Sequence, residues 1–337
     1  MQNESFVFDA RPHYPLLIPV KRYWHADLQS QDDDAVTLVF AHATSFHNEH
    51  WEPVLEDLFG LIGAVKSVGG RTAKIREAWA IGCPNHGDGG IWNEETLAEG
   101  YTPFDWSEFG RSIHLVLAGL GKGVGVDFSQ RKLVGVGHSM GAIAIVLATT
   151  WHPFVRWHSA ILVEPMFVWP GCYERVNRIL VESAPKRRDI WPDKETAHKQ
   201  FLQRFKSWDP RVIELYVRYG LRDLPSKLYP DQTGVTLKCN KRSEAETYKD
   251  AHGRMTAQRY LPTFCAGTPT HAVFGAVPDI LPISNREHVV KDYAHNNFKT
   301  VSVVEDAGHT VVQHNPGGVA ERLCEILLHK DPVKGKL

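Results

Sequence analysis

The chain has 337 residues, of which 43% are hydrophobic and 23% charged, and its formal net charge is −1 at pH 7. This composition is typical of a globular protein able to bury a sizeable core, and the balanced charge gives no electrostatic footprint for nucleic acid. No apolar run approaches the ~20 residues that span a bilayer, so we expect no integral membrane association.

Short apolar runs recur along the chain and are separated by turns and helical patterns. Such alternation predicts an α/β fold with a mostly parallel central sheet covered by helices on both faces. A segment at residues 17–25 precedes the runs and predicts an antiparallel edge strand. The predicted parallel strands are residues 36–41, 77–82, 132–137, 160–163, 271–274 and 300–304.

Between residues 167 and 261 the pattern becomes helical, and we expect no strands there. Asp209-Pro210 is typical of a helix start and Gly220 of a helix end. We therefore expect a core formed by residues 1–166 and 263–337, with residues 167–262 inserted as a helical cap, or lid. Such an insertion covers the carboxyl edge of the sheet, where α/β proteins place their sites.

The segment Gly137-His138-Ser139-Met140-Gly141 is a G-x-S-x-G motif directly after a predicted strand and directly before a helix. This context is typical of a nucleophile elbow, in which a sharp turn exposes a serine hydroxyl above the sheet. Flanking glycines are needed there because side chains would collide with the neighbouring strand and helix. The motif predicts Ser139 as a nucleophile.

A serine hydroxyl needs a base to become a nucleophile. In the elbow arrangement the base follows the last strand, and His309 lies there, after residues 300–304. His314 is the alternative, although it falls where the closing helix should start.

An oxyanion site needs two backbone N–H groups. One is expected from Met140, directly after the nucleophile, and the other from the loop after residues 36–41. Thr44 is our choice for that second donor, with Ala43 or Ser45 as alternatives. We expect His42 to brace this loop.

These motifs together resemble the α/β-hydrolase superfamily from about residue 17 to residue 330. Three stretches, at residues 42–53, 83–89 and 208–225, are similar to fungal hydrolases grouped with the yeast peroxisomal lipase and with host-selective-toxin biosynthesis hydrolases. The resemblance implies a cofactor-free hydrolase with a Ser-His-acid triad. The sequence departs from the family where the usual His-Gly of the oxyanion loop is His42-Ala43, and where the usual G-x-x-D after the penultimate strand is one residue longer.

Two carboxylates compete for the third position of the triad. Asp279 follows residues 271–274, where most of the superfamily keeps its acid, but the extra residue and Pro278 shift its approach. Glu164 follows residues 160–163, one strand after the nucleophile, and its longer side chain suits a reach to His309. We prefer Glu164 and keep Asp279 as the alternative.

We therefore expect a serine hydrolase that cleaves an ester or lactone of a small hydrophobic molecule. Its substrate is expected to contact His138 and Ala43 beside the nucleophile, and Trp169 and Trp191 in the cap. Carbon–carbon hydrolysis and acyl transfer are alternatives on the same machinery. A non-catalytic ligand receptor on a hydrolase scaffold is an alternative of another class.

Other chemistry has little support in the sequence. His47 and His50 are able to share a helix face, but no third metal ligand accompanies them, so we expect no metal. No glycine-rich nucleotide motif follows the first strand, so we expect no cofactor.

Location is indicated by weak signals. Residues 1–10 lack the basic-then-apolar pattern of a secretory signal, and the five cysteines form no CxxC pair, so we expect buried thiols and an intracellular, cytoplasmic protein. The tripeptide Gly335-Lys336-Leu337 differs by one residue from the peroxisomal address Ser-Lys-Leu, which adds the peroxisome as an alternative location.

Overall fold

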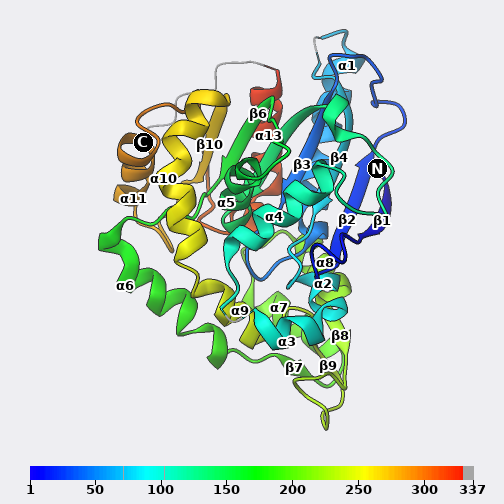
Figure 1. The fold of residues 1–337 in the computed structure, drawn as a ribbon, viewed down its shortest axis with the longest axis vertical. Coiled ribbons are helices and arrows are strands. Elements are labelled where there is room, and N and C mark those ends of the chain that lie inside the picture. The colour runs from blue at the N-terminus through cyan, green and yellow to red at the C-terminus, as the bar shows by residue number, and fades with distance from the viewer. Residues whose placement is uncertain (71, 102, 329–337) are drawn as a thin grey trace.

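The computed structural model describes residues 1–70, 72–101 and 103–328. Its centre is an eight-stranded sheet with the order β1-β2-β4-β3-β5-β6-β10-β11 (Figure 1). Six neighbouring strands run parallel, while β1 and β2 form an antiparallel edge against β4. The strands are β1 (Gln2–Phe8), β2 (Ile18–Trp24), β3 (Val36–Ala41), β4 (Ile75–Ile81), β5 (Lys132–His138), β6 (Ser159–Val163), β10 (Thr270–Gly275) and β11 (Thr300–Val304).

The predicted parallel strands and the predicted antiparallel edge strand are confirmed, with shifts of one or two residues at some ends. β1 was not predicted because its residues are mostly polar and exposed, as expected of a strand that meets the rest of the sheet along one edge only. The apolar residues of the central strands are buried on both faces, which explains their continuous rather than alternating pattern.

Two helical layers cover the sheet. On one face, α1 (Glu52–Ser67) packs against α13 (Pro316–Leu327), and their apolar residues join one core cluster. On the other face, α4 (Trp106–Leu117), α5 (Met140–Leu147) and α10 (His252–Gly267) pack together in a second cluster. Shorter helices occupy the connections: α2 (Gly87–Trp92), α3 (Glu94–Gly100), α11 (Ile283–His288) and α12 (Val311–His314).

The segment between residues 167 and 262 contains helices α6 (Tyr173–Val176), α7 (Lys194–Arg204), α8 (Pro210–Gly220) and α9 (Lys241–Tyr248). It also contains a small antiparallel sheet of the order β7-β9-β8, formed by β7 (Ile190–Trp191), β9 (Val235–Leu237) and β8 (Leu221–Asp223). The expectation of a lid without strands was therefore wrong, because strands of two or three residues are too short to show a period of two.

Helix α8 begins as predicted, with the Asp209 side chain accepting a hydrogen bond from the Arg211 N–H at 2.8 Å. The expected end of the lid at residue 262 falls inside α10, which packs against α4 and α5 of the core. The lid and the core are thus joined by a helix that runs from one into the other. We keep the name lid for residues 167–251, whose role as a lid stays a prediction.

Three remaining expectations concern membrane spans, the cysteines and the C-terminal tripeptide. Among the described residues, no helix is long and apolar enough to cross a membrane. The five cysteine side chains are buried, as predicted. The tripeptide Gly335-Lys336-Leu337 lies outside the described residues, so its role as an address stays a prediction.

Candidate active site

Ser139 lies on the turn between β5 and α5. Its backbone has φ 55° and ψ −114°, a conformation that residues other than glycine rarely adopt. The two flanking residues must be glycines because a Cβ atom at either position would collide with a backbone carbonyl oxygen. A Cβ on Gly137 would lie 2.4 Å from the Gly141 carbonyl oxygen, and a Cβ on Gly141 would lie 2.2 Å from the Ala41 carbonyl oxygen. The turn therefore has the geometry of a nucleophile elbow.

Three side chains from three strand ends meet at this turn. His309 Nε2 lies 2.9 Å from Ser139 Oγ, and His309 Nδ1 lies 3.1 Å from Glu164 Oε2. All three residues are buried. The second oxygen of Glu164 accepts a hydrogen bond from the Gly275 N–H at 2.7 Å, which holds the carboxylate in place. A proton is able to pass from Ser139 to His309, and a carboxylate is in position to stabilise the resulting imidazolium.

Asp279, the other carboxylate considered from the sequence, contacts the same histidine at its backbone. Its Oδ1 accepts hydrogen bonds from the His309 N–H at 2.8 Å and from the Ile280 N–H at 2.6 Å. This geometry orients the loop that carries the imidazole. Glu164 instead reaches the ring, and it does so from a left-handed backbone conformation with φ 43°.

The loop after β3 lies against the start of α5. The Thr44 hydroxyl contacts the Met140 sulfur at 3.4 Å, so the two predicted oxyanion donors are neighbours. The left-handed residue of this loop is Ser45, with φ 78°. Ala43, which stands where the resembled family usually has a glycine, is not among the residues with positive φ, and the left-handed residue comes two positions later.

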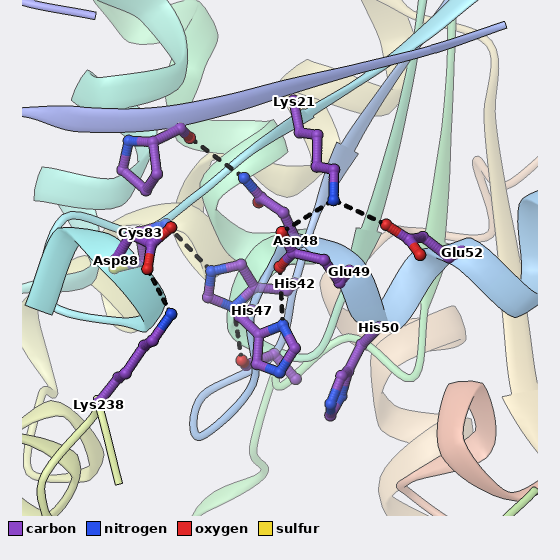
Figure 2. Close-up of polar contacts among 12 residues, drawn as sticks. Lys21, His42, His47, Asn48, Glu49, His50, Glu52, Cys83, Asp88 and Lys238 are labelled. Carbon is purple, nitrogen blue, oxygen red and sulfur yellow. Dashed lines mark hydrogen bonds and ion pairs between the residues drawn. The ribbon is translucent and has the colours of Figure 1, made fainter. Parts of the chain in front are cut away.

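His42 braces this loop through both ring nitrogens, as Figure 2 shows. Its Nε2 accepts a hydrogen bond from the Cys83 N–H at 3.1 Å, so its Nδ1 carries the proton and donates to the Ala43 carbonyl oxygen at 2.8 Å. Burial lowers the pKa of His42 to about 4. The ring is therefore neutral at pH 7, in the tautomer that these two bonds require.

A buried ion cluster lies beside the same loop (Figure 2). Lys21 Nζ is 2.9 Å from Glu52 and 3.2 Å from Glu49, and His47 Nδ1 is 2.9 Å from the other oxygen of Glu49. Burial would raise the pKa of Glu49, but the hydrogen bond from His47 and the charges of His47 and Lys21 lower it to about 2. The cluster ties strand β2 to the segment that follows the oxyanion loop.

The lid holds the oxyanion loop from the opposite side, through residues that the sequence did not indicate. The Ser45 hydroxyl donates to the Glu244 carboxylate of α9, and it lies 2.9 Å from the Tyr248 hydroxyl. Glu244 is buried and forms an ion pair with Arg187. No local pattern marks these residues, since Glu244 lies almost two hundred positions from Ser45 in a hydrophilic helix.

The residues predicted to contact substrate have varied surroundings. His138 donates from Nε2 to the His309 carbonyl oxygen at 2.8 Å, and burial together with the nearby His309 lowers its pKa to about 3. Trp191 is buried in a lid cluster that includes Ala43. Trp169 is partly exposed and stacks on His288, with ring centroids 4.4 Å apart. These contacts do not test the expected substrate contacts of His138, Ala43, Trp169 and Trp191, which stay predictions.

The described residues contain no group of three or more His, Cys, Asp or Glu side chains arranged to hold a metal ion. His47 and His50, the pair noted in the sequence, have ring centroids 4.3 Å apart. They pack against Tyr216 of the lid.

Curated relatives include the type I acyl-CoA thioesterase mpaH of Penicillium roqueforti, which is 27% identical over 231 residues, covering 65% of this chain and 48% of the relative. The abhydrolase domain-containing protein AFT2-1 of Alternaria alternata is 30% identical over 121 residues, covering 35% of this chain and 45% of the relative. The chain thus spans about half the length of the curated relatives it matches, and the predicted resemblance to fungal hydrolases is confirmed.

Solved structures share the fold along nearly the whole chain. The peroxisomal α/β-hydrolase Lpx1 of Saccharomyces cerevisiae superposes with a TM-score of 0.68 at 18% identity, covering 100% of this chain and 93% of that one. E-2-(acetamidomethylene)succinate hydrolase gives a TM-score of 0.69 at 14% identity, covering 97% of this chain and 100% of that one. The model of the alpha/beta hydrolase family matches residues 38–322. The chain therefore belongs to the alpha/beta hydrolase family.

Proposed function

We propose that the protein is a serine hydrolase that cleaves an ester, lactone or thioester of a mainly apolar small molecule through an acyl-enzyme on Ser139. The proposal rests on one observation. Ser139 Oγ, both ring nitrogens of His309 and Glu164 Oε2 form a continuous line of contacts of 2.9 and 3.1 Å inside a buried site.

In the proposed reaction His309 Nε2 takes the proton of Ser139 Oγ while that oxygen attacks the substrate carbonyl. Glu164 offsets the imidazolium charge through the Nδ1–H. The N–H groups of Met140 and Thr44 stabilise the oxyanion, assisted by the amino end of α5, which directly follows the nucleophile. His309 then protonates the leaving group, and water repeats the sequence on the acyl-enzyme.

Thioesters join esters and lactones as candidate substrates because of the relatives, several of which are described as acyl-CoA thioesterases. A thiolate is a better leaving group than an alkoxide, and the same proton transfer serves both. The closed position of Ser139, of which only 6% is exposed, favours a substrate that enters beneath the lid over a broad lipid surface.

A fluorophosphonate probe tests the proposal, because it labels only a serine activated by a base. We expect stoichiometric labelling of the wild-type chain, no labelling of Ser139→Ala, and full labelling of the matched control Ser67→Ala, which changes an exposed serine at the end of α1. Absence of labelling in the folded wild-type chain would instead support the ligand receptor.

A substrate panel then separates the reaction types. We expect release of acid from neutral esters, lactones or thioesters in water, and loss of that release in Ser139→Ala. Acyl transfer would appear as product formed only when an alcohol is added. Carbon–carbon hydrolysis would appear as turnover of β-diketone analogues in the absence of ester turnover.

A further inference from the structure

A cavity of about 490 Å³ lies between two lid segments and the start of α10. One wall is formed by α6 and the helical turn after it, and the opposite wall by the end of α9 and the first turn of α10. This volume lies in the usual range for small-molecule sites. Three of its lining residues are charged, Glu174, Lys249 and Arg254, and the others include the apolar and aromatic side chains of Tyr173, Val176, Val181, Tyr248 and Met255.

Both walls are tied to the candidate active site. On one side, Arg175 of α6 donates to the carbonyl oxygen of Ile280 at 2.9 Å and to that of Asp279, whose carboxylate holds the His309 backbone. On the other side, the Tyr248 hydroxyl lies 2.9 Å from the Ser45 hydroxyl of the oxyanion loop. The cavity is thus bounded by the elements that hold the base loop and the oxyanion loop.

Arg254 gives this cavity its chemical character. Its Nε–H is buried without a hydrogen-bond partner, and its guanidinium lies over the Tyr173 ring at 5.5 Å. The adjacent carboxylate of Asp250 instead accepts backbone N–H bonds from Gly253 and Arg254 at 3.1 Å. Across the described ranges, no carboxylate forms an ion pair with the Arg254 side chain.

A buried donor of this kind is costly unless a partner satisfies it. Guanidinium groups pair with carboxylates and phosphates through two parallel hydrogen bonds, and Tyr173 supports the planar group from one side. The apolar part of the lining suits a hydrocarbon chain joined to the charged group. The apolar lining and the Arg254 guanidinium together suit one ligand, which has an apolar body and an anionic end.

We propose that this cavity binds the part of the substrate remote from the scissile carbonyl, and that Arg254 binds an anionic carboxylate or phosphate oxygen group there. The inference rests on the proposed function and narrows its substrate class to anionic esters or thioesters with an apolar chain. If the anion is a carboxylate, it belongs to the acyl chain of the substrate, and if it is a phosphate, it belongs to the leaving group. One experiment distinguishes these two sources.

The experiment compares three thioesters on the full chain: the octanoyl and the ω-carboxyoctanoyl thioesters of N-acetylcysteamine, and octanoyl-CoA. The variants are Arg254→Gln, Arg254→Lys and the control Arg259→Gln, which changes an exposed arginine further along α10. For Arg254→Gln we expect KM to rise about 10- to 100-fold for an anionic thioester, with KM for the neutral octanoyl thioester and kcat unchanged. Arg254→Lys should restore part of the loss, and Arg259→Gln should match the wild type.

A rise confined to the ω-carboxyoctanoyl thioester assigns the anion to the acyl chain, and a rise confined to octanoyl-CoA assigns it to the leaving group. Equal changes for all three thioesters, or none, overturn the proposal. Calorimetric binding of nonanedioate, the acid that the ω-carboxyoctanoyl thioester releases, gives a second readout that needs no turnover. If the anion belongs to the acyl chain, we expect nonanedioate to bind Ser139→Ala more tightly than the Ser139→Ala, Arg254→Gln double variant. Fluorophosphonate labelling of each variant reports separately on Ser139. If the variants are labelled but Arg254→Gln leaves KM unchanged for every thioester, this inference is refuted while the proposed function stands.

Discussion

Asp279 accepts a hydrogen bond from the backbone N–H of His309 at 2.8 Å, while the imidazole of the same residue meets Glu164 at 3.1 Å. The two carboxylates therefore hold different parts of one residue. Asp279 orients the loop and Glu164 orients the ring. This division leads to separate expectations for their removal.

Glu164→Gln should lower kcat by roughly 10⁴, because the acid sets the imidazole tautomer and stabilises its charge, whereas Asp279→Asn should lower it far less. Asparagine keeps an oxygen that accepts the His309 N–H. Steady-state kinetics on one ester or thioester, with thermal melts to check folding, makes the comparison. Near-full turnover of Glu164→Gln beside a large loss in Asp279→Asn would reverse the assignment.

The contact between Ser45 and Glu244 predicts that the lid helix α9 positions the oxyanion loop. Glu244→Gln removes the buried ion pair with Arg187 and weakens the hold on Ser45, so we expect kcat to fall about 10- to 100-fold with a small change in KM. Glu246→Gln on the same helix is the matched control, because Glu246 pairs with Lys249, which is exposed. Equal effects of the two variants on kcat would argue for a general loss of lid stability.

Replacing glycine with alanine should change the free energy of unfolding in opposite directions at Gly141 and Gly60. Gly141→Ala places a Cβ 2.2 Å from the Ala41 carbonyl oxygen, so α5 must move away from β3, and we expect a loss of at least about 2 kcal/mol in the free energy of unfolding. Gly60→Ala lies in α1 with no atom within 4 Å of its Cβ, and should add about 0.5–1 kcal/mol. Urea unfolding of both variants checks the pair. A Gly141→Ala protein as stable as Gly60→Ala would contradict the close packing at the elbow.

We expect the protein to lose stability in mild acid because His42 and His138 are buried. Burial lowers the pKa of His42 to about 4 and, with the nearby His309, that of His138 to about 3, both from 6.5. The unfolded chain therefore binds protons below pH 6.5 that the folded chain does not, so stability is fully present above pH 6.5 and falls as the pH drops towards these values. Each such group contributes a slope of about 1.4 kcal/mol per pH unit.

Urea unfolding at pH 7 and pH 5 measures this slope. We expect a smaller pH dependence in His138→Gln than in the wild type, and an unchanged one in His13→Gln, which changes an exposed histidine. A wild-type slope in His138→Gln would mean that His138 does not titrate over this range.

The central sheet, the elbow and the position of the base are visible in the sequence because they depend on local patterns. A strand buried on both faces needs a continuous apolar run. The turn at Ser139 needs a glycine at position 137 because of a local contact with Gly141, and a glycine at position 141 because β3 lies beside the turn. The Gly308-His309 pair stands out only because it follows the last of these runs. β1 and the small lid sheet lack such local patterns, since exposed or very short strands leave no distinct periodicity.

The contacts between distant segments were decided only by the tertiary structure. β6 and β10 are neighbours, so Glu164 and Asp279 arrive at the same edge of the sheet, and their sequence positions alone do not say which one reaches the imidazole. The outcome depends on the left-handed backbone of Glu164 and on the Gly275 N–H that holds its carboxylate. The bond from Ser45 to Glu244 and the contact of Arg254 with Tyr173 likewise join segments that are distant in the sequence, and no spacing along the chain records them.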